Sequence, residues 1–185
     1  MPTARGALLE AAKAEFADRG YEGASTREIL RHAGVTAPVL YHHFGNKAGL
    51  FTAVAAHVMD VVVGAFEDAV RPGAGLDANL DAMLAASAAI QARDPQLPRF
   101  VVAAPLDLAR HPELTGAEPE MSRLRLFVED LCAAERAPGL SPKLATRVVL
   151  TLIYGLSRYA ATLEPREFKP TVDAVRRHLL EERAA

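Results

Sequence analysis

The sequence has a single cysteine, Cys132, among its 185 residues, so no disulfide can form within the chain. A lone thiol fits a reducing compartment, and we interpret Cys132 as a small, buried apolar residue. No uninterrupted apolar run reaches the roughly 18 to 20 residues that span a bilayer. Acidic residues at Glu10 and Glu15 argue against a signal peptide. Together these absences predict a cytoplasmic protein that does not enter a membrane.

Motifs of the common enzyme classes are also missing. The sequence has no Gly-rich phosphate loop, no H-E-x-x-H, no G-x-S-x-G and no paired Cys–His candidate for nucleophilic catalysis. Adjacent His42 and His43 could suggest a metal site. Neighbouring residues on a helix diverge by about 100°, however, and no carboxylate or cysteine completes a ligand set. We therefore expect no catalytic residue, no cofactor and no metal.

Charge gives only a weak indication of a partner. The chain carries 21 Lys and Arg against 23 Asp and Glu, a net charge of −2. Between residues 25 and 50, Arg27, Arg31 and Lys47 outnumber Glu28. Proteins that bind nucleic acids usually have a stronger basic excess, so charge alone does not predict DNA binding.

The pattern of apolar residues predicts an all-α fold. Strand-like alternation is almost absent, and apolar residues recur at helical spacing. A first helix is expected over about 3–18, ended by Gly20, whose backbone can adopt a positive φ. We predict about nine helices, with three small ones forming an N-terminal domain (residues 1–48) and the rest a second domain (residues 49–185). The expected helices of the second domain span about 47–70, 76–92, 99–110, 142–162 and 171–185, and a further helix contains residues 121–131 and is ended by Pro138-Gly139.

Helix boundaries crowd together between residues 25 and 51. Ser25 and Glu28 are spaced as a capping box, and Gly34 suits a left-handed turn. Thr36 is then placed to cap a second short helix that ends at Gly45. Helix, glycine turn and short helix form a helix-turn-helix, whose second helix can lie in the major groove of DNA. The periodicity fits an ordinary three-helix bundle without a nucleic-acid role equally well.

One set of residues decides between these interpretations: Thr26, Ile29, Ala33, Gly34, Val35, Thr36, Leu40, Tyr41, His43, Phe44, Asn46, Lys47, Leu50 and Phe51. With them the stretch resembles the DNA-binding domain of the TetR family of transcriptional repressors. The resemblance covers about residues 5–51, roughly a quarter of the chain, without gaps. In the rest of the chain it is architectural only.

The resemblance implies a set of DNA-contacting residues. Pro38 stands where many members have glycine, and Ala48-Gly49 replaces a commonly acidic pair. Ala37 and Pro38 offer bases only apolar contacts, so we expect much of the affinity to come from phosphates and DNA shape. Tyr41 could instead be a half-buried core residue. The implied DNA-binding residues are Thr26, Arg27, Thr36, Ala37, Pro38, Tyr41, His42, His43 and Lys47.

The middle helices are expected to hold a pocket for a small, largely apolar effector, since few charges interrupt their apolar stretches. In the family, the long helix over 47–70 links the DNA-binding domain to the body and moves when a ligand favours one conformation. Methionine and phenylalanine at helical spacing are also ordinary core residues. The ligand-binding candidates are His57, Met59, Phe66, Met83, Phe100, Leu106, Met121 and Phe127.

The helix over 142–162 is apolar nearly all round, and a partner subunit would cover the side that its own domain leaves exposed. With the last helix it would form a two-fold, four-helix interface. An interior helix of a monomer is the alternative. The predicted interface residues are Val148, Leu152, Gly155, Leu156, Tyr159, Val172, Val175 and Leu179.

These observations predict a homodimeric, ligand-responsive transcriptional regulator, most simply a repressor, that binds a palindromic operator in double-stranded DNA and is released by its effector. The alternative is an all-α small-molecule-binding protein or enzyme whose helix-turn-helix-like domain does not bind DNA.

Overall fold

The computed structural model describes residues 3–135, 139–160 and 165–176. Within this part of the chain the structure is all-α, without strands, as predicted. The nine α-helices and one 3-10 helix found there are α1 (Ala4–Gly23), α2 (Thr26–Ala33), α3 (Ala37–Phe44), α4 (Lys47–Ala69), α5 (Leu76–Arg93), α6 (Gln96–Arg110), η1 (Pro112–Ala117), α7 (Glu118–Ala134), α8 (Pro142–Ala160) and α9 (Pro165–Arg176).

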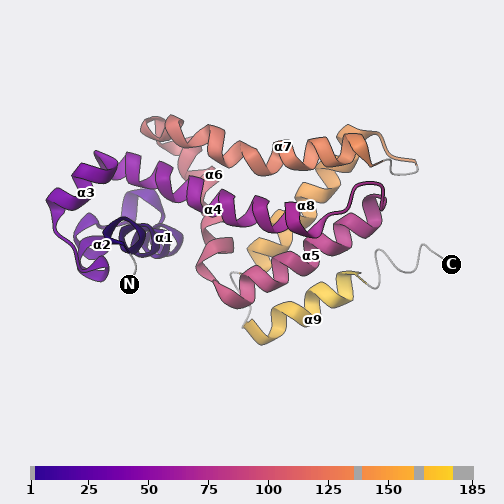
Figure 1. Cartoon of the computed structure of the whole chain (residues 1–185), viewed down its shortest axis with the longest axis horizontal. Helices are drawn as coiled ribbons and strands as arrows, with labels where there is room; N and C mark the ends of the chain where they lie inside the picture. The colour runs from indigo at the N-terminus through magenta and orange to yellow at the C-terminus, as the bar shows by residue number, and fades with distance from the viewer. Residues whose placement is uncertain (1–2, 136–138, 161–164, 177–185) are drawn as a thin grey trace.

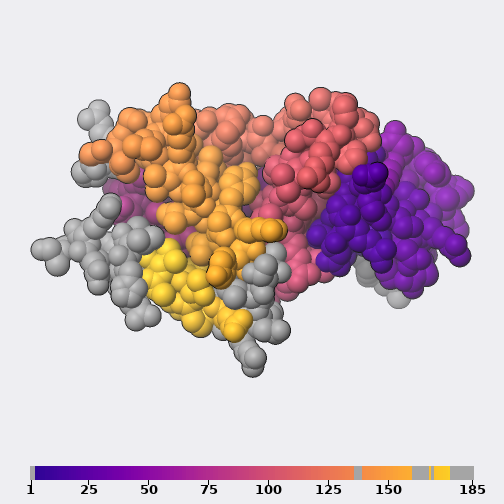
Figure 2. Space-filling view, turned by 180° about the vertical axis from the view of Figure 1, so that it is seen from behind, coloured from indigo at the N-terminus to yellow at the C-terminus, as the bar shows by residue number. Residues whose placement is uncertain are grey.

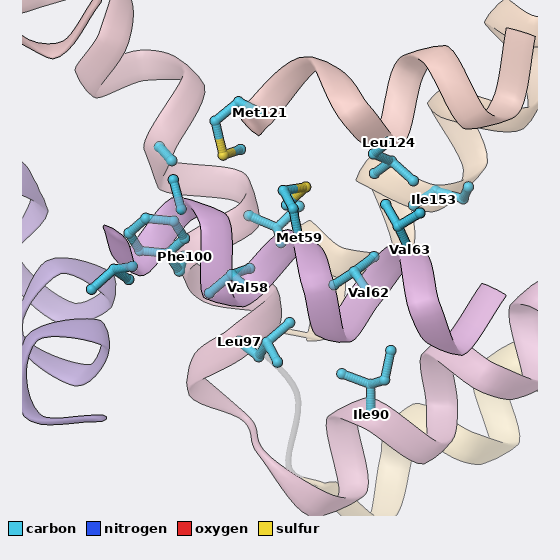
Figure 3. Packing of buried hydrophobic residues seen from close by; sticks show 14 of the residues in the cluster. Val58, Met59, Val62, Val63, Ile90, Leu97, Phe100, Met121, Leu124 and Ile153 are labelled. Carbon is cyan, nitrogen blue, oxygen red and sulfur yellow. The ribbon is translucent and has the colours of Figure 1, made fainter. Parts of the chain in front are cut away.

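The helices form a small head and a longer body. Figure 1 shows α1, α2 and α3 gathered at one end, while α4 leaves them and runs into the body between α5 and α7. Helix α4 packs against α1 in the head and against α5 and α7 in the body. A close view of the body core shows α4 side chains directed at its neighbours from several sides (Figure 3), namely Val58, Met59, Val62 and Val63 facing Ile90, Leu97, Phe100, Met121, Leu124 and Ile153.

Helix α4 is the one helix in the described ranges that is long and apolar enough to cross a membrane by length and composition. Half of its apolar window is buried inside the protein. That burial is typical of the central helix of a helical domain, which is apolar because neighbouring helices surround it.

Most predicted helix ends are confirmed, because short-range contacts define them. Gly34 is left-handed at φ 66° and ψ 30°, and the Asn46 side chain accepts the Gly49 N–H at 2.8 Å to begin α4. Ser141 accepts the Leu144 N–H at 3.3 Å before α8.

The first helix is interrupted where it was predicted to end, because Gly20 has a non-helical backbone at φ 68° and ψ 178°, and a further turn carries α1 to Gly23. The capping box is confirmed in part. The Ser25 hydroxyl accepts the Glu28 N–H at 3.4 Å, as a capping box requires. Glu28, however, does not return a bond to Ser25 and instead accepts from the Arg31 Nε at 2.9 Å. Glu15 of α1 replaces it, accepting the Ser25 N–H at 3.2 Å.

Candidate nucleic-acid interface and ligand cavity

The turn between α2 and α3 fixes the direction of the second helix. The N–H of Val35 donates to the Leu30 carbonyl at 3.2 Å across the left-handed Gly34, which closes the end of α2. Thr36 begins α3 with an extended backbone, and its side chain makes no capping hydrogen bond. Its hydroxyl, which is exposed, therefore remains available to another acceptor or donor.

Helix α3 presents a polar outer face on a buried anchor. Leu40 is 1 % exposed and holds the helix to the head. Tyr41, by contrast, is 57 % exposed, so it is not the half-buried core tyrosine that the sequence left open. His42 and His43 are exposed beside it, with ring centroids 5.3 Å apart. Short side chains with hydrogen-bonding groups can approach a nucleic-acid backbone closely.

The remaining groove-facing candidates lie at the start of α3, where Ala37 is half-buried and Pro38 exposed. On α2, Thr26 is half-buried in the first turn and Arg27 is exposed. In the described part of the chain no three His, Cys, Asp or Glu residues lie close enough to hold a metal.

Lys47 is less free than the sequence suggests. Its Nζ donates to the Glu22 carbonyl at 3.2 Å and lies 4.7 Å from the centre of the Tyr21 ring. Burial lowers the pKa of this ammonium group, and the carboxylates of Asp107 and Glu22 oppose that shift. The cation is thus held where α1 ends, at the N-terminus of α4, rather than extending into solvent.

A narrow apolar cavity lies in the body among α4, α5, α6, α7 and α8. It has about 380 Å³ of empty space, part of it at its open mouth. Only about 20 Å³ of it can hold the centre of a water molecule, so the lining side chains nearly fill the cavity. Ser87 and Ser157 bring its two hydroxyl groups, and the other lining residues are apolar: Val62, Phe66, Ile90, Leu97, Pro98, Val101, Leu124 and Ile153.

Polar contacts join α6 of the body to α1 of the head. Asp94, directly before α6, accepts from the Lys13 ammonium, which is almost fully buried. About one and a half turns further along each helix, Arg99 Nη1 donates to Asp18 Oδ1 at 3.2 Å. Because Leu97 of the same helix lines the cavity, α6 has the cavity on one side and the head on another.

The third contact between these helices is buried. Asp107 of α6 is 9 % exposed, and its Oδ2 accepts the N–H of Tyr21 at 2.9 Å. The His111 ring packs edge-on against Tyr21 with centroids 5.1 Å apart. Burial raises the pKa of Asp107, against the opposing effects of the Tyr21 N–H and the nearby basic side chains of His111, Arg110 and Lys47.

A model of the family described as bacterial regulatory proteins, tetR family, matches residues 8–54. This segment contains most of α1, both helices of the helix-turn-helix and the beginning of α4. Over residues 8–54, about a quarter of the chain, the sequence is similar to the TetR family. Members of this family are regulatory proteins, which agrees with the prediction that the chain is not an enzyme.

A similar relative confirms where the likeness is concentrated. The HTH-type transcriptional activator FasR of Mycolicibacterium smegmatis is 46 % identical over 67 residues, covering 36 % of this chain and 31 % of that protein. The chain therefore matches about a third of the length of this curated relative.

The comparison with solved structures shows a similar fold over the body as well as the head. A TetR-family regulator from Shewanella sp. PV-4 has a TM-score of 0.73 and 21 % identity, with 96 % of each chain covered. FadR from Bacillus subtilis, in complex with stearoyl-CoA, has a TM-score of 0.71 and 18 % identity, with 95 % of each chain covered. At these identities the comparison shows the TetR-like fold alone.

The eight predicted ligand-binding residues fall into three environments. Phe66 lines the apolar cavity, and Phe127 packs near it with ring centroids 6.3 Å apart. His57 lines a separate polar cleft between head and body, where its Nε2 lies 3.3 Å from Glu10 Oε1. Leu106 is 57 % exposed on the outer side of α6. The others belong to the buried core: Met59, Met83, Phe100 and Met121.

The predicted dimer residues are also divided. On α8, Val148 and Tyr159 are 42 % and 60 % exposed, which excludes an interior helix buried on all sides. Gly155 is exposed as well, and Leu152 and Val175 are half-buried. Leu156 and Val172 are buried in the core of this subunit. Leu179 lies outside the described residues.

Two residues that make contacts between helices could not be identified from the sequence. Arg5 of α1 lies over the Phe44 ring, 5.7 Å from its centre, which places a cation at the end of α3. Asp107 forms the buried contact with Tyr21. The sequence does not reveal the partner of either residue, because each acts on a helix that is distant in the sequence. A charged residue inside an otherwise apolar helical stretch was the one available sign for Asp107.

Proposed function

We propose that the chain is a dimeric, ligand-responsive transcriptional repressor that works in the cytoplasm. Residues 1–48 bind a palindromic operator, and residues 49–185 bind a small, largely apolar effector and dimerise. One observation carries this proposal. The outer face of α3 is exposed and rich in hydrogen-bonding groups, while Leu40 holds its inner face at 1 % exposure. A helix fixed in this way can enter a major groove without unfolding.

In the proposed complex the two recognition helices of a dimer reach half-sites one DNA turn, about 34 Å, apart. The side chains of Thr26, Tyr41 and His43 contact phosphates, and Arg27 reaches a phosphate or a guanine. Thr36, Ala37, Pro38 and His42 face the groove. Lys47 acts at the N-terminus of α4, where its charge adds to that of the helix dipole. Arg5 is a further cation at the same end of the head.

The effector proposal rests on the cavity. A pocket with eight apolar residues and two serines favours a ligand with an apolar body and few hydrogen-bonding groups. FadR from Bacillus subtilis, which has a similar fold, is solved in complex with stearoyl-CoA, and the stearoyl chain of that molecule is an apolar body of this kind. Because α6 lines the cavity with Leu97 and contacts the head with Arg99, an occupied cavity would displace α6 and, with it, the head.

Selection from a pool of random duplexes tests the DNA-binding proposal directly. We expect an enriched palindrome whose half-sites are one helical turn apart. If no sequence is enriched and binding is weak and insensitive to salt, the head does not bind DNA. A promoter fused to a reporter then gives the sign of regulation, since FasR is named an activator.

Replacing Arg27 tests one proposed contact. We expect Arg27→Ala to lower duplex affinity by about tenfold for all sequences and to reduce the salt slope by about 1. The matched control is Arg71→Ala, which removes the same charge in the exposed loop after α4, far from the head. Binding isotherms at several salt concentrations measure both quantities. Equal slopes for the two variants would remove Arg27 from the contact surface.

A further inference from the structure

Large apolar side chains are exposed mainly on one side of the body. Seven are exposed in the described residues, and four of them lie on α6 and α8: Leu106, Leu144, Val148 and Tyr159. Their exposed fractions range from 42 % to 60 %. Figure 2 shows this side, with α8 in orange in front and α6 in salmon beside it, next to the head. Apolar surface of this extent is typical of a site that another molecule covers.

An open groove runs between the two helices. Val102, Pro105 and Leu106 form its α6 wall, and Leu150 and Gly155 belong to its α8 wall. Nothing lies within 4 Å of the position that a Cβ on Gly155 would take. A partner helix can therefore approach the α8 backbone closely at this point. The groove shares no lining residue with the apolar cavity.

The groove continues the surface on which the dimer was proposed. Exposed uncharged positions of α8 recur at helical spacing, from Leu144 through Val148 and Thr151 to Gly155 and Tyr159, and the exposed Arg147 and Arg158 line the groove beside them. They form one stripe along the helix, because residues three or four apart share a face. Leu106 of α6 lies at the edge of this stripe. A molecule that covers the α8 stripe at Thr151 and Gly155 also reaches the groove.

We propose that a second copy of this chain covers the groove, so that α6, and Leu106 in particular, belongs to the dimer interface together with α8. This inference rests on the proposed dimer and adds an element to it. Its consequence is that α6 contacts the partner, the effector cavity and the head. Any displacement of α6 by an effector would then change both the orientation of the head and the contact between subunits.

Sedimentation velocity on the full chain tests this inference. A buried glutamate at an interface position is costly, so Leu106→Glu should raise the dimer dissociation constant at least about thirtyfold. The control is Leu126→Glu, which changes an apolar residue of similar exposure on α7, outside the groove. This variant should dimerise like the wild type. Far-UV circular dichroism at matched concentration confirms that both variants are folded.

The outcomes separate the inference from the dimer proposal. If wild type is a dimer and Val148→Glu dissociates it while Leu106→Glu does not, the dimer stands and the role of α6 is wrong. A wild type that stays monomeric at all concentrations overturns both, and with them the reading of a palindrome by two recognition helices.

A second variant avoids the introduced charge. Leu106→Cys should react with an alkylating reagent quickly in dilute protein and at least about tenfold more slowly once the dimer forms, as expected for a contact shielded from solvent. The native Cys132 is buried and provides the internal reference. A reaction rate at position 106 that is independent of protein concentration would overturn the inference.

Discussion

Replacing Gly49 with alanine is expected to disrupt the head. Gly49 lies in the first turn of α4, where a Cβ atom would overlap the carbonyl oxygen of Phe44, the last residue of α3. The same oxygen accepts the Asn46 N–H at 2.9 Å. The Phe44 carbonyl oxygen belongs to the backbone and cannot turn away as the end of a flexible side chain could. The backbone itself must therefore move. The sequence showed only that Gly49 stands at a commonly acidic position, and this contact gives a physical reason for the glycine.

We expect Gly49→Ala to lower the free energy of unfolding by about 2 kcal/mol, the ordinary cost of forcing an extra methyl group into a packed site. Duplex affinity should fall at least about tenfold, since the displaced Phe44 carries the end of α3 with it. Denaturant unfolding and binding isotherms measure the two effects. Neither low temperature nor high protein concentration should restore the free energy of unfolding or the duplex affinity, because the end of α3 itself is displaced.

The matched control is Gly64→Ala, in the middle of the same helix. Nothing lies within 4 Å of the Cβ position there. Alanine is about 1 kcal/mol better than glycine in a helix interior, so this variant should be slightly more stable than wild type. If Gly49→Ala were stabilised in the same way, the contact between Gly49 and Phe44 would not constrain the head, and the first prediction would be wrong.

The success of sequence reasoning here follows from the range of the contacts involved. Gly34, Asn46 and Ser141 mark helix ends through bonds that span three to five residues, and such patterns are visible in the chain itself. The outer face of α3 was predictable for the same reason. Leu40 faces the core and Tyr41 does not, as helical periodicity requires.

Contacts between helices could not be predicted in this way. The bond from Ser25 to Glu15 and the bond from Tyr21 to Asp107 join different elements. Periodicity shows that a residue is apolar and on one face of its helix, but not which neighbour covers that face. On α6, Val101 lines the cavity while Leu106 lines the groove. The ligand candidates were therefore scattered between cavity, core and surface.

Asp107 offers a test of how the body holds the head. Asp107→Ala leaves the buried Tyr21 N–H without its acceptor, so we expect a loss of about 2 kcal/mol in the free energy of unfolding. Asp107→Asn keeps an acceptor oxygen in a side chain of the same shape and should lose much less at neutral pH. Denaturant unfolding of the three proteins at neutral pH measures the difference. Equal losses for both variants would mean that the carboxylate charge, not the hydrogen bond, stabilises the junction.

The pH dependence of stability provides an independent check on the same residue. Burial raises the pKa of Asp107 in the folded protein above its ordinary value, so the folded state binds this proton more readily than the unfolded chain does. The resulting stabilisation is complete below the unfolded pKa, about 3.9, and is lost as the pH rises through the folded pKa. The amide introduced by Asp107→Asn cannot titrate. The contributions of the other titrating groups to the pH dependence of stability therefore cancel when wild type is compared with this variant. We therefore expect the stability of wild type relative to the variant to be greatest at about pH 4 or below and to decline to a plateau toward neutral pH. A relative stability that rises with pH would mean that Lys47, Arg110 and His111 stabilise the charged carboxylate more than burial destabilises it.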